Sequence, residues 1–395
     1  MSILAKNHLL TDKGANMKKL LSIILLVLAM AMCSIGLVAC GENPNDGETG
    51  LLTTKYRSDD FYTVTRFIAE DEETVLDLGA EAKEGEVIGR IKKGAFSGND
   101  TIKELIIPDT VTIIDEGAFA GMEALEKITL PFVGKTAVAD AYIGETGEGE
   151  KSVDSERNFG YVFGTARYDY STSVTQNYNA SETATYYLPL TLKEITINPA
   201  SDYTLPAYAF NGIRTINKVI FSDEVVRIGE GAFAGCTSLK TVAYLTDTGV
   251  EVGLSSAVTY IGDSAFSGCS ALKDKNGEVG FAFNANNAVT KLGKETFKGA
   301  GLNVVNLPSN LTEIGVGCFR ESAVTKVTTS ATKIGASAFN GCQDFVSFNS
   351  ATDDCIDLTG ITDIGNYAFA NLNESVTFTV IGSASDSIFW DTNVL

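Results

Sequence analysis

The stretch Ile228-Gly229-Glu230-Gly231-Ala232-Phe233-Ala234-Gly235-Cys236-Thr237-Ser238-Leu239 decides the fold, because variants of it recur from about residue 88 to the C-terminus. Each copy is centred on a phenylalanine, with an aliphatic residue five positions earlier and usually a small residue directly before the ring. The nine central phenylalanines are Phe96, Phe119, Phe210, Phe233, Phe266, Phe297, Phe319, Phe339 and Phe369. Shared features at fixed offsets identify an internal repeat rather than a bias in composition.

One copy cannot fold alone, because one phenylalanine and a few aliphatic residues bury too little apolar surface to offset the ordering of about twenty residues. Stacked copies would instead bring the phenylalanines into one row and the aliphatic residues into flanking rows, as in solenoid proteins. Neighbouring phenylalanines lie 20 to 23 residues apart in the compact copies and 30 to 33 apart where we expect inserted loops. The sequence therefore predicts a β-rich repeat solenoid.

Each copy contains two extended stretches in which alternate apolar residues point inwards. One stretch precedes the phenylalanine, as in Val258 to Ile261, and the other follows it, as in Leu125 to Leu130. The segment between them is too short for a full helix, and we expect one helical or 3-10 turn there. The glycine two residues after the phenylalanine is expected to provide a positive φ or a close approach between copies.

The pattern V-T-x-I-G-x-x-A-F-x-G-C is nearly intact in Val258-Thr259-Tyr260-Ile261-Gly262-Asp263-Ser264-Ala265-Phe266-Ser267-Gly268-Cys269. This pattern resembles the BspA-like leucine-rich repeat family of bacterial and protist surface proteins, over roughly residues 85–395. The resemblance implies a right-handed leucine-rich-repeat-type coil with parallel strands and short helical or 3-10 turns. It also implies display at the cell surface and a role in adhesion or host contact. No particular ligand is implied, because the consensus residues form the scaffold and the variable residues contact the ligand.

The N-terminal segment has the features of a lipoprotein signal. Met17-Lys18-Lys19 is basic and Leu20 to Met32 is apolar, as in a secretory signal, and this run is short for a membrane-spanning helix. Leu37-Val38-Ala39-Cys40 resembles the bacterial lipobox, which implies lipidation of Cys40 after cleavage. An ordinary signal that is cleaved near a cysteine is the alternative. We expect residues 1–39 to hold upstream residues and the signal peptide, and the mature protein to be secreted and anchored at the bacterial cell surface by its lipid.

The mature chain divides into three parts. Residues 40–60 are polar, acidic and rich in turn formers, which predicts a disordered tether after the lipidated cysteine. Residues 61–87 alternate like strands, and we interpret them as an N-terminal cap that closes the first copy. Residues 88–395 form the solenoid, with a tyrosine-rich insertion at about 133–187 where the repeat nearly vanishes. Phe163 lies about two copy lengths from either neighbouring phenylalanine, so we expect it to anchor a degenerate copy.

Two sets of residues are candidates for ligand binding. The first is a ladder of outward positions in the second extended stretch, rich in Thr and Asn and free of charge. Its candidates are Thr129, Thr196, Asn306, Thr328 and Asn349, and the same ladder includes Ile106, Ile220, Ala243 and Thr379. Such a ladder either forms a flat, lightly polar binding strip or only stabilises a parallel sheet.

The second set comes from the insertion, which holds half of the tyrosines of the chain. Tyrosine gives a large contact area at a low cost in conformational entropy, which is typical of recognition surfaces. The candidates of this set are Tyr161, Tyr168, Tyr170 and Tyr178. The alternative is that the tyrosines only cover one edge of the solenoid.

The residue types argue against catalysis. The only histidine, His8, precedes the signal, which excludes Ser–His and Cys–His catalysis and most zinc sites from the mature chain. Five cysteines follow Cys40, three of them at one repeat offset, and we expect buried free thiols rather than disulfides. We expect no cofactor and no metal site. With 50 Asp and Glu residues, a carboxylate pair could still resemble a glycosidase site.

The charge balance restricts the partners. Fifty acidic residues against 30 basic ones give a net charge of −20, which argues against nucleic acid and anionic membrane surfaces. We expect a non-catalytic binding or adhesion protein that recognises a matrix protein, surface protein or glycan on host or neighbouring cells, through the strand face and the inserted loops. The alternatives are a cell-surface glycan-processing enzyme with a carboxylate pair, and a structural scaffold without an external ligand. The sequence does not determine the ligand or the oligomeric state.

Overall fold

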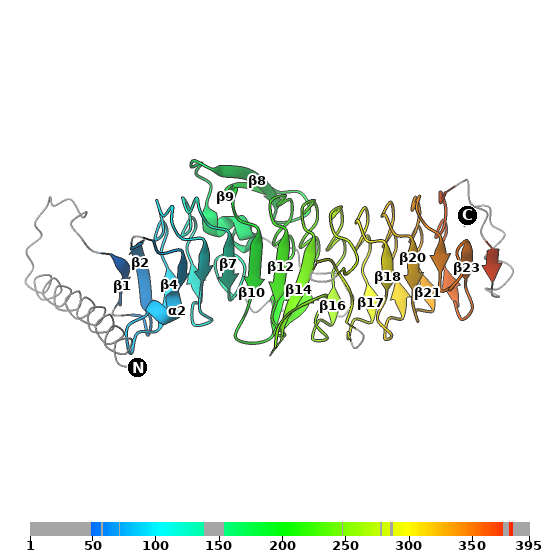
Figure 1. Ribbon diagram of the computed structural model, residues 1–395, viewed down its shortest axis with the longest axis horizontal. Coiled ribbons are helices and arrows are strands. Elements are labelled where there is room, and N and C mark those ends of the chain that lie inside the picture. The colour runs from blue at the N-terminus through cyan, green and yellow to red at the C-terminus, as the bar shows by residue number, and fades with distance from the viewer. Residues whose placement is uncertain are drawn as a thin grey trace, which may run out of the picture. The chain divides into compact units, whose positions relative to one another are not determined.

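The structure is a computed structural model that describes residues 49–381, apart from 57, 71, 138–153, 247, 277–278, 285–286 and 374–378. Cys40, the signal segment and the part of the expected solenoid beyond residue 381 lie outside the described residues. The chain divides into two compact units, residues 1–50 and 51–395, and the second holds the solenoid. In this unit short strands stack on one another nearly in chain order, and each stacked copy is called a coil below (Figure 1).

Two rows of mostly parallel strands run through the coils. The entry row, before the phenylalanines, contains β1 (Gly50–Thr54), β2 (Tyr62–Ile68), β4 (Ile88–Ile91) and β6 (Ile113–Ile114) in one sheet, and β11 (Tyr203–Leu205), β13 (Val225–Ile228), β16 (Tyr260–Ile261), β17 (Lys291–Leu292), β19 (Glu313–Ile314), β21 (Lys333–Ile334) and β24 (Asp363–Ile364) in another. The exit row, after the phenylalanines, contains β3 (Val75–Asp77), β5 (Glu104–Ile106), β7 (Lys127–Leu130), β10 (Glu194–Ile197), β12 (Lys218–Phe221), β14 (Thr241–Thr246) and β15 (Gly249–Val252) in one sheet, and β18 (Val304–Asn306), β20 (Lys326–Thr328), β22 (Ser347–Phe348), β23 (Cys355–Asp357) and β25 (Thr379–Ile381) in another.

Few other elements interrupt the two rows in the described part of the chain. They are the hairpin of β8 (Ser171–Asn177) and β9 (Thr183–Pro189), the short helix α2 (Leu78–Glu81), and the 3-10 helices η1 (Ser155–Arg157) and η2 (Phe159–Phe163). The predicted β-rich solenoid of leucine-rich-repeat type with parallel strands is therefore confirmed.

The aliphatic residues five positions before the phenylalanines are the inward residues of the entry row. Parallel pairing places Ile91 beside Ile114 in the first sheet. In the second sheet it aligns Leu205, Ile228, Ile261, Leu292, Ile314, Ile334 and Ile364 in one register. All nine side chains are buried, because alternation along each strand turns them away from solvent.

The phenylalanines form a continuous row of buried rings. From Phe67 to Phe369, the centroids of neighbouring rings lie 5.0 to 5.9 Å apart. From Phe210 onward the neighbouring ring planes lie within 11° of parallel. Phe163 carries the row across the insertion, as predicted, and Phe159 supplies a second ring between Phe163 and Phe210 that the sequence analysis missed.

A third ladder of hydrogen bonds follows the row of rings. The N–H of each central phenylalanine donates to the C=O of the residue directly before the next phenylalanine, as from Phe233 to Ala265 and from Phe319 to Ala338, both at 2.8 Å. The side chain directly before the ring is therefore enclosed between coils, and Ala265 and Ala338 are fully buried. This enclosure explains why the repeat requires a small residue there.

The residues two positions before and two positions after the central phenylalanine have a positive φ, as at Gly231 (58°) and Gly235 (76°). Glu321 and Asn371, which replace the second glycine, keep φ values of 57° and 54°. The expected short turn is thus a 3-10 helix at Phe159–Phe163 and a series of hydrogen-bonded turns in the other described coils. The left-handed residues bound each turn and prevent a longer helix.

Consensus side chains also connect neighbouring coils. The hydroxyl of the threonine in V-T-x-I-G donates to a backbone C=O of the preceding coil, as from Thr259 to Val226 at 3.1 Å. The thiol of Cys236 contacts the C=O of Phe210 at 3.1 Å, and burial raises the pKa of this thiol to about 12. All five cysteines of the described chain are free and buried, which confirms the predicted thiols.

One prediction for the N-terminal region needs correction. Residues 61–87, where we expected a cap, form a coil that packs on the first copy: Phe67 lies against Phe96 and β2 pairs with β4. Within the expected tether, β1 is a strand that lies beside β2, and the hydroxyl of Thr65 donates to the C=O of Leu52 at 3.1 Å. The apolar pair Leu51-Leu52 makes this segment suited to covering the edge of the sheet.

Replacing Phe266 by alanine should lower the free energy of unfolding by about 3–5 kcal/mol, because it opens a cavity between two stacked rings. Tyr170 is 71% exposed and provides the control. Tyr170→Ala should change the free energy by less than about 0.5 kcal/mol. Denaturant unfolding of both variants gives the two values, and equal losses would contradict the assignment of core and surface.

Candidate binding surfaces

The predicted Thr–Asn ladder lies on the outward side of the exit row, but in two separate blocks. Thr129 pairs with Thr196 in the first sheet, where both side chains are half-buried. Asn306 pairs with Thr328 in the second sheet, where both are exposed. The structure therefore brings the members of each block together and keeps the two blocks apart.

The end of the ladder differs from the prediction. Asn349 follows β22 beside Thr328, and its Oδ1 accepts the N–H of Thr329 at 2.7 Å, so its amide links two neighbouring coils. Thr379 does not belong to the ladder, because the register through the intervening strand β23 aligns Asp357 and then Ile381 with the ladder position. Thr379 pairs instead with Cys355. The inserted strand is too short to be recognised as a separate element in the sequence.

The exit row breaks at the coil of Phe266 because a lysine occupies an inward position. Nine residues after Phe233 stands Val242, which is fully buried, whereas nine residues after Phe266 stands Lys275, which is exposed. An unpaired ammonium group is too costly to bury, so the coil cannot continue the strand. Phe281 fills the interior instead, with its ring 5.6 Å from Phe266 and 5.4 Å from Phe297.

A cavity of about 270 Å³ lies at this break. It is lined by Asp274, Lys275, Phe281, Ala282, Phe283, Leu302, Val304, Val305 and Asn306. One predicted ladder residue, Asn306, thus borders a hollow with two phenylalanines in its wall. The sequence analysis missed this cavity, although Lys275 at an apolar offset was a signal for it.

The tyrosine-rich insertion folds into the β8–β9 hairpin, which lies along one edge of the coils (Figure 1). Buried Gln176 attaches it to the solenoid: Oε1 accepts the N–H of Gly160 at 2.7 Å, and Nε2 donates to the C=O of Ala209 at 3.0 Å. The hydroxyl of buried Tyr186 donates to the C=O of Ser155 at 2.8 Å. A Cβ on Gly160 would overlap the ring of Tyr186, so this contact requires glycine.

The four predicted tyrosines do not form one site. Tyr161 and Tyr178 are half-buried. The hydroxyl of Tyr168 is buried without a hydrogen-bond partner among the described residues, and burial raises its pKa. Tyr170 alone is fully presented to solvent, at 71% exposure and with a φ of 53° that tyrosine rarely adopts.

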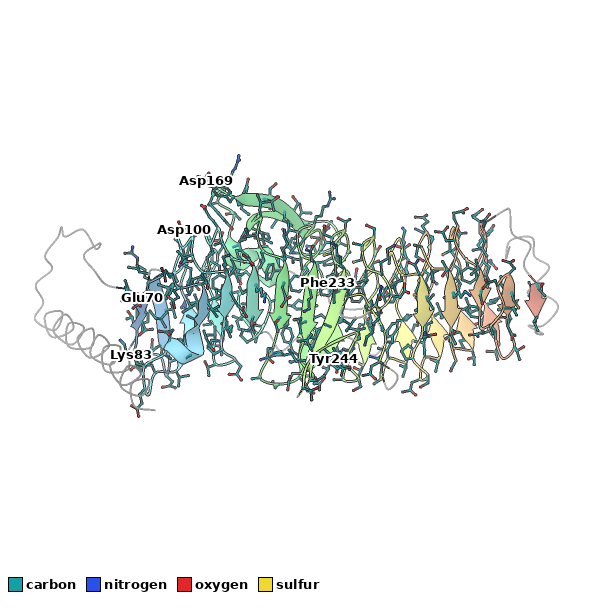
Figure 2. The ribbon with its side chains drawn as sticks, in the orientation of Figure 1. Glu70, Lys83, Asp100, Asp169, Phe233 and Tyr244 are labelled. Carbon is teal, nitrogen blue, oxygen red and sulfur yellow. The ribbon has the colours of Figure 1, made fainter. Side chains whose placement is uncertain are left out.

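An exposed apolar pair is present at the base of the hairpin. The C=O of Tyr170 accepts the N–H of Leu190 at 3.0 Å, and Leu190 is 46% exposed. These two residues are called the Tyr170–Leu190 patch below. Figure 2 shows Asp169, two residues before the start of β8, at one end of the hairpin. Among residues 154–187 of the insertion, the tyrosines thus divide into those that cover the solenoid and one that projects from it.

Elsewhere the outward strand positions carry opposite charges on neighbouring coils. Lys218 lies 3.5 Å from Glu194 in the exit row, and Lys291 lies 3.2 Å from Glu313 in the entry row. Such half-exposed pairs add little stability. They do neutralise each other locally, whereas the Thr–Asn blocks carry no charged side chain at the ladder positions.

The described residues offer little for catalysis. No group of His, Cys, Asp and Glu in the described part of the chain is arranged to hold a metal ion. A membrane-spanning helix was sought in the same part of the chain and none was found. Burial raises the pKa of Glu73, and the nearby carboxylates of Glu81 and Glu70 raise it further.

Comparison with known proteins agrees with this architecture. A family model, the BspA type leucine rich repeat region, matches six copies at residues 87–141, 179–281, 244–349 and 280–394. The ranges leave out part of the insertion. No curated protein matches the chain.

Several solved structures are similar over most of their length. A leucine-rich repeat protein from Bacteroides ovatus is 16% identical, with 86% of this chain and 91% of that chain covered and a TM-score of 0.32. A leucine rich cell surface protein from Faecalibacterium prausnitzii is 16% identical, with 88% and 97% covered and a TM-score of 0.31. A leucine rich repeat protein from T. pallidum is 16% identical, with 85% and 92% covered and a TM-score of 0.27.

Replacing Gln176 by leucine should lower the free energy of unfolding by about 1–3 kcal/mol, because the buried N–H of Gly160 loses its acceptor. Thr175→Val, on the exposed side of the same strand, is the control and should stay within about 0.5 kcal/mol of the unchanged protein. Denaturant unfolding gives both values, and hydrogen exchange locates the loss. If the two variants are equally stable, Gln176 does not hold the hairpin.

Proposed function

The chain belongs to the BspA-type leucine-rich repeat family, and from this premise we propose that it is a non-catalytic binding protein displayed at the bacterial cell surface. Membership of this family supports a protein-interaction role at the surface. The proposed ligand is a matrix protein, a cell-surface protein or a glycan on a host cell or a neighbouring cell. The net charge of −20 argues against nucleic acid as the partner.

The observation that carries this proposal is the Tyr170–Leu190 patch on its anchored hairpin. Large apolar side chains that remain exposed together on a folded domain often mark an interaction surface. Tyrosine is also frequent among the residues that dominate binding energy. Because Gln176 and Tyr186 attach the hairpin to the core, little entropy would be lost when the patch meets a partner.

The Thr–Asn blocks are a second, weaker candidate for contact with the ligand. Asn306 and Thr328 are exposed and adjacent, whereas Thr129 and Thr196 are half-buried. The exposed block therefore has the better access to a ligand, and its amide and hydroxyl groups suit hydrogen bonds to a protein or a glycan. Its contribution would add to that of the Tyr170–Leu190 patch.

The double variant Tyr170→Ala, Leu190→Ser should weaken retention on the ligand roughly tenfold or more, as truncation of a dominant contact does. Retention is measured on immobilised matrix proteins, mucins and whole cells. Tyr367→Ala is the matched control, because Tyr367 is 46% exposed and also has a positive φ. Deleting the insertion would be a poor test, because Phe159 and Phe163 belong to the core. Unchanged retention of the double variant, or an equal loss in the control, would argue against the patch.

The anchor is proposed to be a lipid on Cys40, the cysteine of the lipobox-like segment. Cys40→Ala should release the protein from the membrane fraction and abolish incorporation of a labelled fatty acid. Cys33→Ala, which changes a cysteine inside the signal segment, is the control and should leave both unchanged. Membrane fractionation and labelling of expressing cells test this, and labelled Cys40→Ala protein in the membrane fraction would refute it.

A further inference from the structure

The break at Lys275 leaves β18 without a neighbouring strand on one side. β18 is the end strand of its sheet and pairs only with β20. On the β20 side, the N–H of Lys326 donates to the C=O of Asn303 at 3.1 Å, and the N–H of Leu307 donates to the C=O of Thr328 at 2.9 Å. In a parallel ladder the bonding side alternates from residue to residue, so Val304 and Asn306 direct their N–H and C=O groups away from β20.

These four backbone groups have no hydrogen-bond partner among the residues that the structure describes. Neither Val304 nor Asn306 has a backbone hydrogen bond to any residue that the structure describes. The preceding residue differs, since Asp274 Oδ1 accepts the N–H of Asn303 at 3.1 Å in place of a strand carbonyl. The edge is therefore capped at its start and free along Val304–Asn306, and a free edge is a template for another strand.

The cavity of about 270 Å³ opens beside this edge, because Val304, Val305 and Asn306 form one of its walls. Phe283 belongs to the lining and is half-buried, with its ring 5.2 Å from the ring of Phe281. The volume lies just below the range of about 300–1,000 Å³ that is typical of small-molecule sites. It suits a single apolar side chain better than a whole cofactor or drug-sized ligand.

The charged group beside the cavity indicates which second side chain a ligand would carry next to the apolar one. Lys275 lines the cavity, is exposed, and makes no ion pair with any residue in the described ranges. Asp274 also lines the cavity, but its Oδ1 accepts the N–H of Asn303 at 3.1 Å, so the ammonium group of Lys275 is the charged group of the lining that has no partner among the described residues. An acidic side chain near the apolar one would complement Lys275, whereas a basic one would be repelled.

We propose that an extended peptide segment of a protein partner adds as a strand to the free edge of β18. The segment pairs with Val304 and Asn306, inserts one apolar side chain beside Phe283, and directs an acidic side chain to Lys275. A peptide is favoured because only a strand backbone repeats N–H and C=O groups at the spacing that this edge presents. The inference rests on the binding function proposed above but uses a surface other than the Tyr170–Leu190 patch.

The test is a selection of random linear peptides on the protein from residue 41 onward, followed by affinity measurements on the enriched peptides. We expect enriched peptides to combine an apolar residue with an acidic one. Val304→Pro removes an N–H that faces the cavity and leaves the bonds to β20 intact, and proline is tolerated at strand edges. It should weaken binding roughly three- to tenfold, the equivalent of about one hydrogen bond.

Two further measurements do not depend on that variant. N-methylation of the pairing residues of the peptide should weaken binding to the unchanged protein by roughly tenfold or more, because two bonds are lost. Saturating peptide should also slow hydrogen exchange at the amides of Val304 and Asn306, while the amide of Val305, already paired with β20, changes little. Lys275→Glu should weaken the binding of the acidic peptides and leave the binding of a neutral analogue unchanged.

The proposal is overturned if no peptide is enriched, or if N-methylated peptides bind as well as unmodified ones. It is also overturned if the protein is a dimer in solution that Val304→Pro converts to monomer, since a second copy would then occupy the edge. Tyr170→Ala should leave peptide binding unchanged. Loss of surface retention in the Tyr170→Ala, Leu190→Ser variant without any enriched peptide would refute this inference alone. Enriched peptides that bind as expected, with unchanged retention of that variant, would refute the Tyr170–Leu190 patch alone.

Discussion

The structure depends on the hydrogen bond from each central phenylalanine N–H to the residue before the next phenylalanine. This bond fixes the separation of neighbouring turns, and the rings between them lie 5.0 to 5.9 Å apart. That separation is close to the spacing of about 4.8 Å between hydrogen-bonded strands, so turns and strands can advance together. The small residue before each ring and the left-handed residues on either side of it follow from the same constraint. The sequence and the loop length can vary in segments that do not take part in this series of hydrogen bonds.

The sheets break where the row of rings does not. At the insertion the entry row stops after β6 and resumes at β11, yet Phe163 and Phe159 continue the rings. At Lys275 the exit row stops, yet the rings of Phe266 and Phe297 remain stacked. Both interruptions place unusual groups at the surface, a projecting hairpin at one and a free strand edge at the other. Recognition is therefore best sought at the interruptions, where the consensus no longer determines each side chain.

The roles of repeated residues could be predicted from the sequence, because equivalent positions of all copies lie in the same structural environment. The inward aliphatic residues, the role of Phe163 and the buried thiols were all predictable in this way. Residues that occur once could not: Gln176 gives no local sign that its amide will meet the backbone of a coil 33 residues away. Thr379 was misplaced because the pairing of β25 with the short strand β23 puts Ile381, and not Thr379, at the ladder position. For the ladder, the sequence correctly placed Thr129 beside Thr196 and Asn306 beside Thr328. It wrongly predicted that all of these residues form one continuous strip.

Nearest-neighbour stacking also has a mechanical consequence. Each coil is held by the coil before it and the coil after it, so stability is distributed along the chain rather than concentrated in one centre. A pulling force between a fixed end and a bound partner would therefore detach coils from an end, one after another. Each detached coil lengthens the chain and leaves the remaining coils folded. A solenoid built in this way can absorb stretching while the part that contacts its partner stays intact.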